Sequence, residues 1–144
     1  MRKVAALIAV LVAASVAYTY WPTAEQSTAI PAQSGAPGAA IVDVMVPETL
    51  SQNAQIGQKA FEGNCAACHG INAVGQDGVA PPLVHKIYEP SHHGDESFQR
   101  AAAQGVQAHH WRFGNMPAVE GITRGEVTLI IAYIRELQRA NGIN

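Results

Sequence analysis

Charged side chains are scarce in this chain of 144 residues: Asp, Glu, Lys and Arg together make up 14% of it. Soluble domains usually contain about 25%, so part of the 48% hydrophobic content is expected to lie outside a soluble core. The formal net charge of −2 excludes nucleic-acid binding through a basic face, and also an acidic solvating tail. Two cysteines are too few for a disulfide scaffold. The length suits one domain with a single core.

The apolar excess is concentrated near the N-terminus. Arg2 and Lys3 precede an uncharged run over residues 4–21 that consists mainly of Ala, Val, Leu and Ile. In a helix this run would extend about 27 Å, which is enough to cross the hydrocarbon core of a bilayer. We predict a signal-anchor over residues 1–21, with an interfacial belt formed by Tyr18, Tyr20 and Trp21. Because positive charge stays on the cytoplasmic side, the rest of the chain is expected on the periplasmic side of a bacterial inner membrane.

A cleaved secretory signal peptide is the alternative interpretation of the same run. Signal peptides also combine a basic start and an apolar stretch with small residues at the cleavage site, which Ser15 and Ala17 would supply. In that case the mature protein would be soluble in the periplasm.

The composition changes after the apolar run. Residues 22–40 are rich in Pro, Ala, Gly, Ser, Thr and Gln, with Glu25 as the only charge and Ile30 as the only large aliphatic residue. Such a segment cannot bury enough surface to fold by itself. We therefore predict a flexible linker over residues 22–50, in which the more apolar stretch 41–46 could lie extended against the folded domain. The domain itself is expected to cover residues 51–144.

The most specific motif lies at residues 65–69, with the sequence Cys-Ala-Ala-Cys-His. On a helical turn, both sulfurs lie on one side, and the histidine that follows can reach an iron held beside them. This is the attachment pattern of c-type haem, with thioether bonds from Cys65 and Cys68 and with His69 as proximal iron ligand. The alternatives are a thioredoxin-like redox pair, half of a zinc site and a structural disulfide. A redox pair should follow a strand, whereas residues 56–61 look helical, and a second pair of zinc ligands is missing. We predict one covalently attached haem c.

A second iron ligand is suggested by residues 114–117, with the sequence Gly-Asn-Met-Pro. Methionine is in general more often core filler than ligand. Here, however, Met1 and Met45 lie outside the predicted domain, which leaves Met116 as the only methionine within it. A thioether ligand would favour reduced iron and would leave no open coordination position. We predict Met116 as the sixth ligand.

Several residues flank the haem motif at a recognisable spacing. Gly57 and Phe61 precede it, Pro81 and Leu83 follow it, and Tyr133 lies in an apolar C-terminal run. In this order the chain resembles the class I cytochrome c family over almost all of residues 51–144. The resemblance implies an all-α fold, in which an N-terminal and a C-terminal helix cross and short helices and loops surround one haem. It also implies that Gly57 permits the close crossing beside Tyr133, that the Pro81 carbonyl accepts a hydrogen bond from the ligand histidine, and that Leu83 packs on the haem.

The C-terminal helix can also be predicted from its own residues. Thr123 and Glu126 form a capping box, and Asn141 followed by Gly142 is a helix stop signal. One face carries apolar residues at helical spacing, namely Val127, Ile130, Ile131, Ile134 and Leu137. The charged residues Glu126, Arg135 and Arg139 are expected to lie elsewhere. This helix is predicted to be part of the core.

Five histidines besides His69 lie between the haem motif and the C-terminal helix, at positions 85, 92, 93, 109 and 110. One hypothesis is a second metal site, with copper as the candidate metal, built from the two His-His pairs. Adjacent residues of an extended chain point to opposite sides, which argues against it. The other interpretation is polar loops, with one or two rings near a haem propionate. Trp111 and Arg112 are further candidates for the haem environment, because an indole N–H or a guanidinium near a propionate is common in the family.

The predicted function is electron transfer rather than catalysis. An iron with two protein ligands has no place for a substrate, so its chemistry is one-electron exchange between larger redox proteins of a respiratory chain. Mitochondrial-type members of the family surround the exposed haem edge with lysines, whereas here only Lys59 and Lys86 lie within residues 51–144. A weakly charged, partly apolar contact is therefore expected. The alternatives are a haem enzyme or sensor with an open iron position, and a His-rich periplasmic copper-handling protein.

Overall fold

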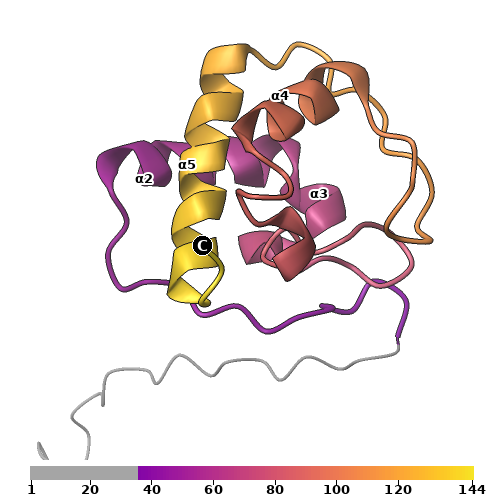
Figure 1. Ribbon diagram of the computed structural model, residues 1–144, viewed down its shortest axis with the longest axis horizontal. Coiled ribbons are helices and arrows are strands. Elements are labelled where there is room, and N and C mark those ends of the chain that lie inside the picture. The colour runs from indigo at the N-terminus through magenta and orange to yellow at the C-terminus, as the bar shows by residue number, and fades with distance from the viewer. Residues whose placement is uncertain (1–35) are drawn as a thin grey trace, which may run out of the picture. The chain divides into compact units, whose positions relative to one another are not determined.

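The computed structural model describes residues 36–144, which form helices joined by loops with no β-strand in that range (Figure 1). In chain order, the elements are α2 (Gln52–Asn64), α3 (Ala66–His69), the 3-10 helices η1 (Ile71–Ala73) and η2 (Lys86–Tyr88), α4 (Asp95–Gln104) and α5 (Arg124–Ala140). The predicted all-α class is thereby confirmed for the domain. The predicted signal-anchor lies outside the described residues. Between residues 36 and 144, no helix combines the length and the hydropathy that crossing a bilayer requires.

The core is organised by the crossing of α2 and α5, with α2 passing behind α5 in Figure 1. A Cβ atom on Gly57 would lie 1.9 Å from the carbonyl oxygen of Leu129, so only glycine allows the two backbones to approach this closely. Next to the crossing, the rings of Phe61 and Tyr133 pack with their centroids 5.8 Å apart, and both are fully buried. The crossing that the resemblance implied is present, with Tyr133 beside it.

Helix α5 begins and ends at the residues that its sequence predicts. The Thr123 hydroxyl accepts from the backbone N–H of Glu126, and the Glu126 carboxylate accepts from the N–H of Thr123, which completes the capping box. The predicted apolar face is buried in full, from Val127 to Leu137. The prediction for Arg135 is wrong: its side chain is buried on α5, because backbone carbonyls from a distant loop meet its guanidinium there.

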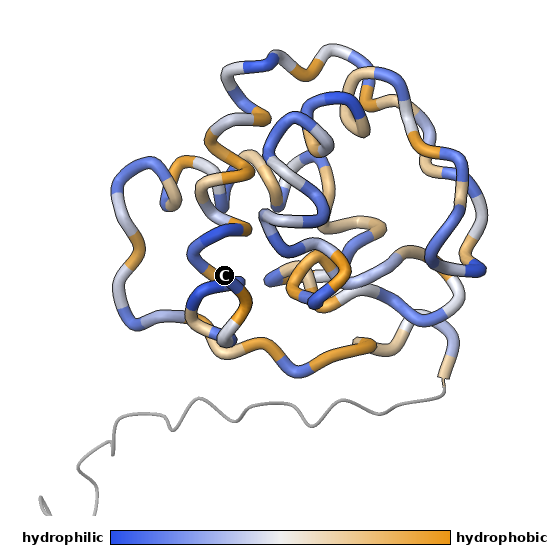
Figure 2. Tube along the Cα trace, viewed as in Figure 1, coloured by the Kyte–Doolittle hydropathy of each residue, from blue (hydrophilic) through white to orange (hydrophobic). Residues whose placement is uncertain are grey.

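The predicted linker also ends earlier than expected. The backbone N–H of Gly38 donates to Asp77, and the N–H groups of Ile41 and Val42 both donate to the carbonyl of Val74. Val44 and Leu50 pack against the core. Figure 2 shows hydrophobic and hydrophilic positions interspersed along this extended segment. Residues 38–50 therefore belong to the folded unit, because they satisfy backbone groups of the 74–77 loop and cover apolar surface.

Candidate functional site

The Cys-Ala-Ala-Cys-His motif occupies a tight helical turn directly after α2. Cys65 ends α2, and its N–H donates to the Phe61 carbonyl at 2.8 Å. The N–H groups of Cys68 and His69 then both donate to the Cys65 carbonyl, at 3.1 and 2.9 Å. Cys65 is half-buried, Cys68 is exposed, and neither forms a disulfide. The turn thus carries two unpaired thiols, four residues and one residue before His69.

The thiol chemistry of Cys65 argues against a redox pair at this motif. Burial, and to a smaller extent the neighbouring Cys68 thiol, raises the pKa of Cys65 to about 11. A reactive redox cysteine needs a thiolate, which a depressed pKa favours. Helix α2, rather than a strand, precedes the motif. Against a zinc site, neither cysteine lies close enough to two other His, Cys, Asp or Glu side chains within residues 36–144 to share a metal ion with them.

His69 is oriented by a single hydrogen bond. The ring is only 8% exposed, and its Nδ1 lies 2.8 Å from the carbonyl oxygen of Pro81. Since a carbonyl can only accept, Nδ1 carries the proton and Nε2 keeps its lone pair. Burial lowers the pKa of His69, while the hydrogen bond to Pro81 opposes that shift. The ring is therefore neutral and presents Nε2 as a metal ligand.

The Pro81 carbonyl is itself held in place by its neighbours. Pro82 is fully buried, and the N–H of Leu83 donates to the Ala73 carbonyl at 2.9 Å. Leu83 is partly buried and packs against the core cluster that contains Phe61 and Tyr133. These contacts fix the backbone on both sides of the atom that orients His69.

Three residues of the loop after the motif were missed by the sequence analysis: Asn72, Ala73 and Gln76. Asn72 and Ala73 adopt left-handed backbone angles, with φ of 57° and 60°. The Asn72 side chain accepts a hydrogen bond from the Tyr133 hydroxyl at 2.9 Å, which ties this strained loop to α5. The side-chain amide of Gln76 donates to the Ala67 carbonyl at 2.9 Å and thereby caps the motif turn. Asn72 could have been suspected, because asparagine tolerates the left-handed region better than most residues.

Met116 comes from a separate segment, which is held by its backbone. The N–H groups of Val106 and Met116 each donate to the other residue's carbonyl, at 2.9 and 3.0 Å. Gly105 makes this pairing possible, because its φ is +75° and a Cβ atom there would lie 2.4 Å from the Met116 oxygen. The Met116 side chain is half-buried. The methionine is thus presented by a constrained loop and is not part of the buried core.

Trp111 has an unsatisfied hydrogen-bond donor. Its indole Nε1 is buried and makes no well-aligned hydrogen bond in the described part of the chain, although the Tyr88 hydroxyl lies near enough to interact with it and to lower the pKa of Tyr88 slightly against the larger effect of burial. The indole ring stacks on Phe113, with centroids 5.7 Å apart, and meets the edge of His85 at 5.2 Å. Arg112, the other candidate for the haem environment, is exposed. A buried N–H without a partner costs free energy unless an acceptor completes the site.

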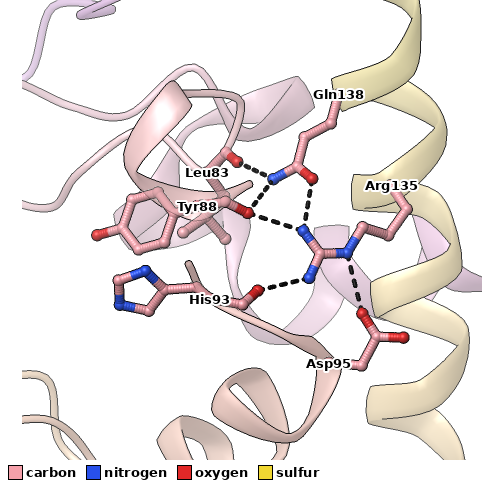
Figure 3. Close-up of polar contacts among 6 residues, drawn as sticks. All are labelled: Leu83, Tyr88, His93, Asp95, Arg135 and Gln138. Carbon is pink, nitrogen blue, oxygen red and sulfur yellow. Dashed lines mark hydrogen bonds and ion pairs between the residues drawn. The ribbon is translucent and has the colours of Figure 1, made fainter. Parts of the chain in front are cut away.

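A buried polar network ties the loop around η2 to α5, and it was also missed by the sequence analysis (Figure 3). Gln138 donates to the Leu83 carbonyl at 2.8 Å and accepts from Arg135 at 2.6 Å. The Arg135 guanidinium donates to the carbonyls of Tyr88 and His93, at 2.7 and 2.6 Å, and pairs with the Asp95 carboxylate at 3.0 Å. The sequence does contain a signal for their burial. Arg135 and Gln138 follow Val127 and Ile131 at helical spacing and therefore lie on the same buried face of α5.

One comparison with known proteins identifies the family. The family model for cytochrome c matches residues 54–138, from the first turn of α2 to the last turn of α5. The match therefore includes the Cys-Ala-Ala-Cys-His turn, the Pro81 carbonyl and the Met116 loop.

Proposed function

This chain belongs to the cytochrome c family, and we propose that it works as a one-electron carrier whose iron is held between His69 and Met116. It is a class I c-type cytochrome, and its cofactor is covalently bound haem c. When bound, the haem supplies an iron that alternates between the ferric and ferrous states. The observation that carries the ligand assignment is the buried His69 ring, which the Pro81 carbonyl turns so that Nε2 is free.

The residues present fit this cofactor in three respects. Cys65 and Cys68 offer unpaired thiols for the two thioether bonds. His69 offers a neutral imidazole nitrogen. The buried indole N–H of Trp111 makes no well-aligned hydrogen bond to the described residues, and a propionate carboxylate would satisfy it. We therefore assign Trp111 to the haem environment, with Leu83 as an apolar neighbour.

The Met116 ligand is tested by an optical spectrum of the ferric holoprotein. The Met116→Ala variant is expected to lose the weak near-infrared band of methionine ligation. Its reduction potential should also fall, because a thioether favours reduced iron. Met45→Ala is the matched control and should keep both properties, since Met45 is 67% exposed and precedes α2, outside the segment from Cys65 to Met116. A Met116→Ala variant that retained the band would refute the assignment. Absence of the band from the unmodified protein would instead favour the enzyme or sensor alternative, in which one coordination position of the iron is open.

The electron exchange surface is proposed to surround the exposed Cys68. Ile71, two residues after the motif, is 69% exposed, and Val79 is 43% exposed. The Gln76 side chain ties the loop that contains Val79 to the motif turn. Residues 51–144 contain seven Lys or Arg residues and eight Asp or Glu residues, so their charges nearly balance. Electrostatic attraction to a partner is therefore expected to be weak, and the apolar contact to dominate. A weakly charged patch suits short encounters with redox partners.

This surface can be tested with the protein as its own partner. The rate of electron self-exchange between ferric and ferrous holoprotein should fall about tenfold or more in Ile71→Glu at low salt, because like charges then oppose each other. Added salt should restore most of the rate. Ile71→Gln adds polarity without charge and should change the rate much less. An unchanged rate in Ile71→Glu would place the electron exit elsewhere.

We also propose that residues 4–21 anchor the domain at the periplasmic face of the inner membrane. The support is the basic start and the uncharged run of the sequence. Membrane fractions should retain the haem protein through a high-salt wash and release it with detergent. Release by salt alone would favour the cleaved, soluble form.

A further inference from the structure

Four histidine rings gather on one side of the domain, although they come from two separate loops. His92 and His93 follow η2, whereas His109 and His110 follow α4. The His110 ring lies 5.4 Å from that of His92 and 5.2 Å from that of His93, measured between centroids. The ring nitrogens of these four histidines are not used in the proposed haem site, and the buried polar network uses only the backbone carbonyl of His93.

The turn before α4 explains why adjacent histidines can act together. The backbone N–H groups of His92 and His93 both donate to the Glu89 carbonyl, at 3.1 and 2.8 Å. The chain is therefore turned rather than extended, and the alternation that separates neighbouring side chains does not apply. The two rings lie on the same side, with their centroids 4.6 Å apart. Because of this turn, the objection that adjacent histidines point to opposite sides does not hold for His92 and His93.

His93 is the most firmly oriented member of the cluster. Its Nδ1 lies 2.7 Å from the Ile87 carbonyl oxygen, so Nδ1 carries the proton and Nε2 is free. The His93 carbonyl accepts from the buried Arg135 at 2.6 Å. Figure 3 shows this carbonyl turned toward Arg135 and the ring directed away from it. A ring nitrogen held by a carbonyl on its other side is the arrangement typical of metal-binding histidines.

We propose that His92, His93 and His110 bind a divalent late first-row transition metal, with Cu²⁺ bound most tightly and Zn²⁺ less tightly. One ring nitrogen from each residue lies within 4.8 Å of the other two. A tetrahedral cation with ligands at about 2.0–2.1 Å brings its nitrogens to about 3.3 Å from one another. The exposed His92 and His110 side chains can close this gap by torsion, while His93 stays fixed. Imidazole suits both metals, and the general order of affinity places Cu²⁺ above Zn²⁺.

This site is separate from the haem iron and adds a function to electron transfer. Its three ligands do not include Cys65, Cys68, His69 or Met116. The fourth coordination position is left to water. The proposal does not depend on the identity of the iron ligands, so it stands or falls by itself.

The test is equilibrium dialysis of the full-length ferric holoprotein against Cu²⁺ or Zn²⁺, followed by elemental analysis. The haem iron provides an internal count of protein molecules. The expected result is one added cation per iron for each metal, with a lower Kd for Cu²⁺. The ferric state prevents reduction of Cu²⁺ by the haem, and Zn²⁺ is a redox-inert check on the same site.

Variants from the two loops distinguish a tertiary site from local binding by one histidine pair. His92→Gln and His110→Gln should each raise the Kd by about tenfold or more, since even the loss of a group that only supports a ligand costs this much. His109→Gln is the matched control, because His109 neighbours His110 but does not belong to the set of three. It should leave the Kd nearly unchanged. An unchanged visible spectrum verifies that each variant is folded around its haem.

Three results would overturn the proposal. One is the absence of stoichiometric binding by either metal. Another is a loss of binding in His92→Gln but not in His110→Gln, which would show binding by a single loop. The third is an equal loss in His109→Gln, which would show that the wrong histidine of the pair has been assigned.

Discussion

The crossing of α2 and α5 leads to a quantitative prediction for Gly57. In Gly57→Ala, the new methyl group would lie 1.9 Å from the Leu129 carbonyl oxygen and 2.5 Å from its carbon. The obstacle is backbone rather than a flexible side chain, so the helices must separate. Overpacking of a core typically costs 1–3 kcal/mol, and such a severe overlap belongs at or above the upper end. Alanine returns about 1 kcal/mol through its helix propensity. The net loss of unfolding free energy is expected to be about 2 kcal/mol or more.

Gly63 provides the matched control within the same helix. A Cβ atom there meets nothing within 4 Å, so Gly63→Ala collects only the propensity gain. It should raise the unfolding free energy by about 0.5–1 kcal/mol. The two substitutions are chemically identical and are expected to have opposite signs.

The assay is guanidinium unfolding of the ferric holoprotein, followed by far-ultraviolet circular dichroism. The slope of the transition should stay the same in both variants, so that the midpoints report stability. Each 1 kcal/mol should also shift Tm by about 4–8 °C for a domain of this size. If Gly57→Ala were as stable as the parent, or as stable as Gly63→Ala, the close crossing would not be the reason for this glycine.

Three further predictions concern buried polar groups. Arg135→Met should lower the unfolding free energy by about 2–4 kcal/mol, because it leaves the His93 carbonyl and the buried Gln138 amide oxygen without the donor that Arg135 supplies. Arg124→Met removes only an exposed ion pair with Glu96 and should cost less than about 1 kcal/mol. Equal effects of the two substitutions in chemical denaturation would contradict the role of the buried network. Burial raises the pKa of the Tyr133 hydroxyl from the ordinary value of 10.0 to about 12, with a smaller contribution from Glu62. The folded state therefore favours the neutral hydroxyl, and this contribution to stability is fully present below pH 10. It is lost as the pH rises from 10 to about 12. Tyr133→Phe should lose less stability over that range, and parallel alkaline unfolding curves would argue against this origin. Trp111→Phe removes the buried indole N–H and should change the reduction potential measured by titration, and an unchanged potential would remove Trp111 from the haem environment.

The candidate site was largely predictable because its signals are local. The haem motif needs only one helical turn to place Cys65, Cys68 and His69 together. The capping box of Thr123 and Glu126 involves neighbouring residues, so it too can be read from the sequence. The Pro81 hydrogen bond followed only from the resemblance, because twelve residues separate it from His69 and no spacing rule connects them.

The parts that could not be predicted depend on contacts between distant segments. Arg135 was expected outside the core because a charge is costly to bury. The structure offsets that cost with carbonyls of Tyr88 and His93, more than forty residues away in the chain. Residues 38–50 were assigned to the linker, and only the apolar stretch 41–46 was expected to lie against the domain, because composition does not reveal that the 74–77 loop needs backbone partners.

The sequence by itself determined the cofactor and the boundaries of the last helix, because each depends on residues within one or two turns of one another. The all-α class followed from the resemblance over residues 51–144. The scarcity of charge had already separated an apolar N-terminal run from the domain. Only the tertiary structure decided where Arg135 lies and which histidines meet. Burial of an arginine needs acceptors from another loop, and a metal site needs nitrogens brought together from both sides of α4.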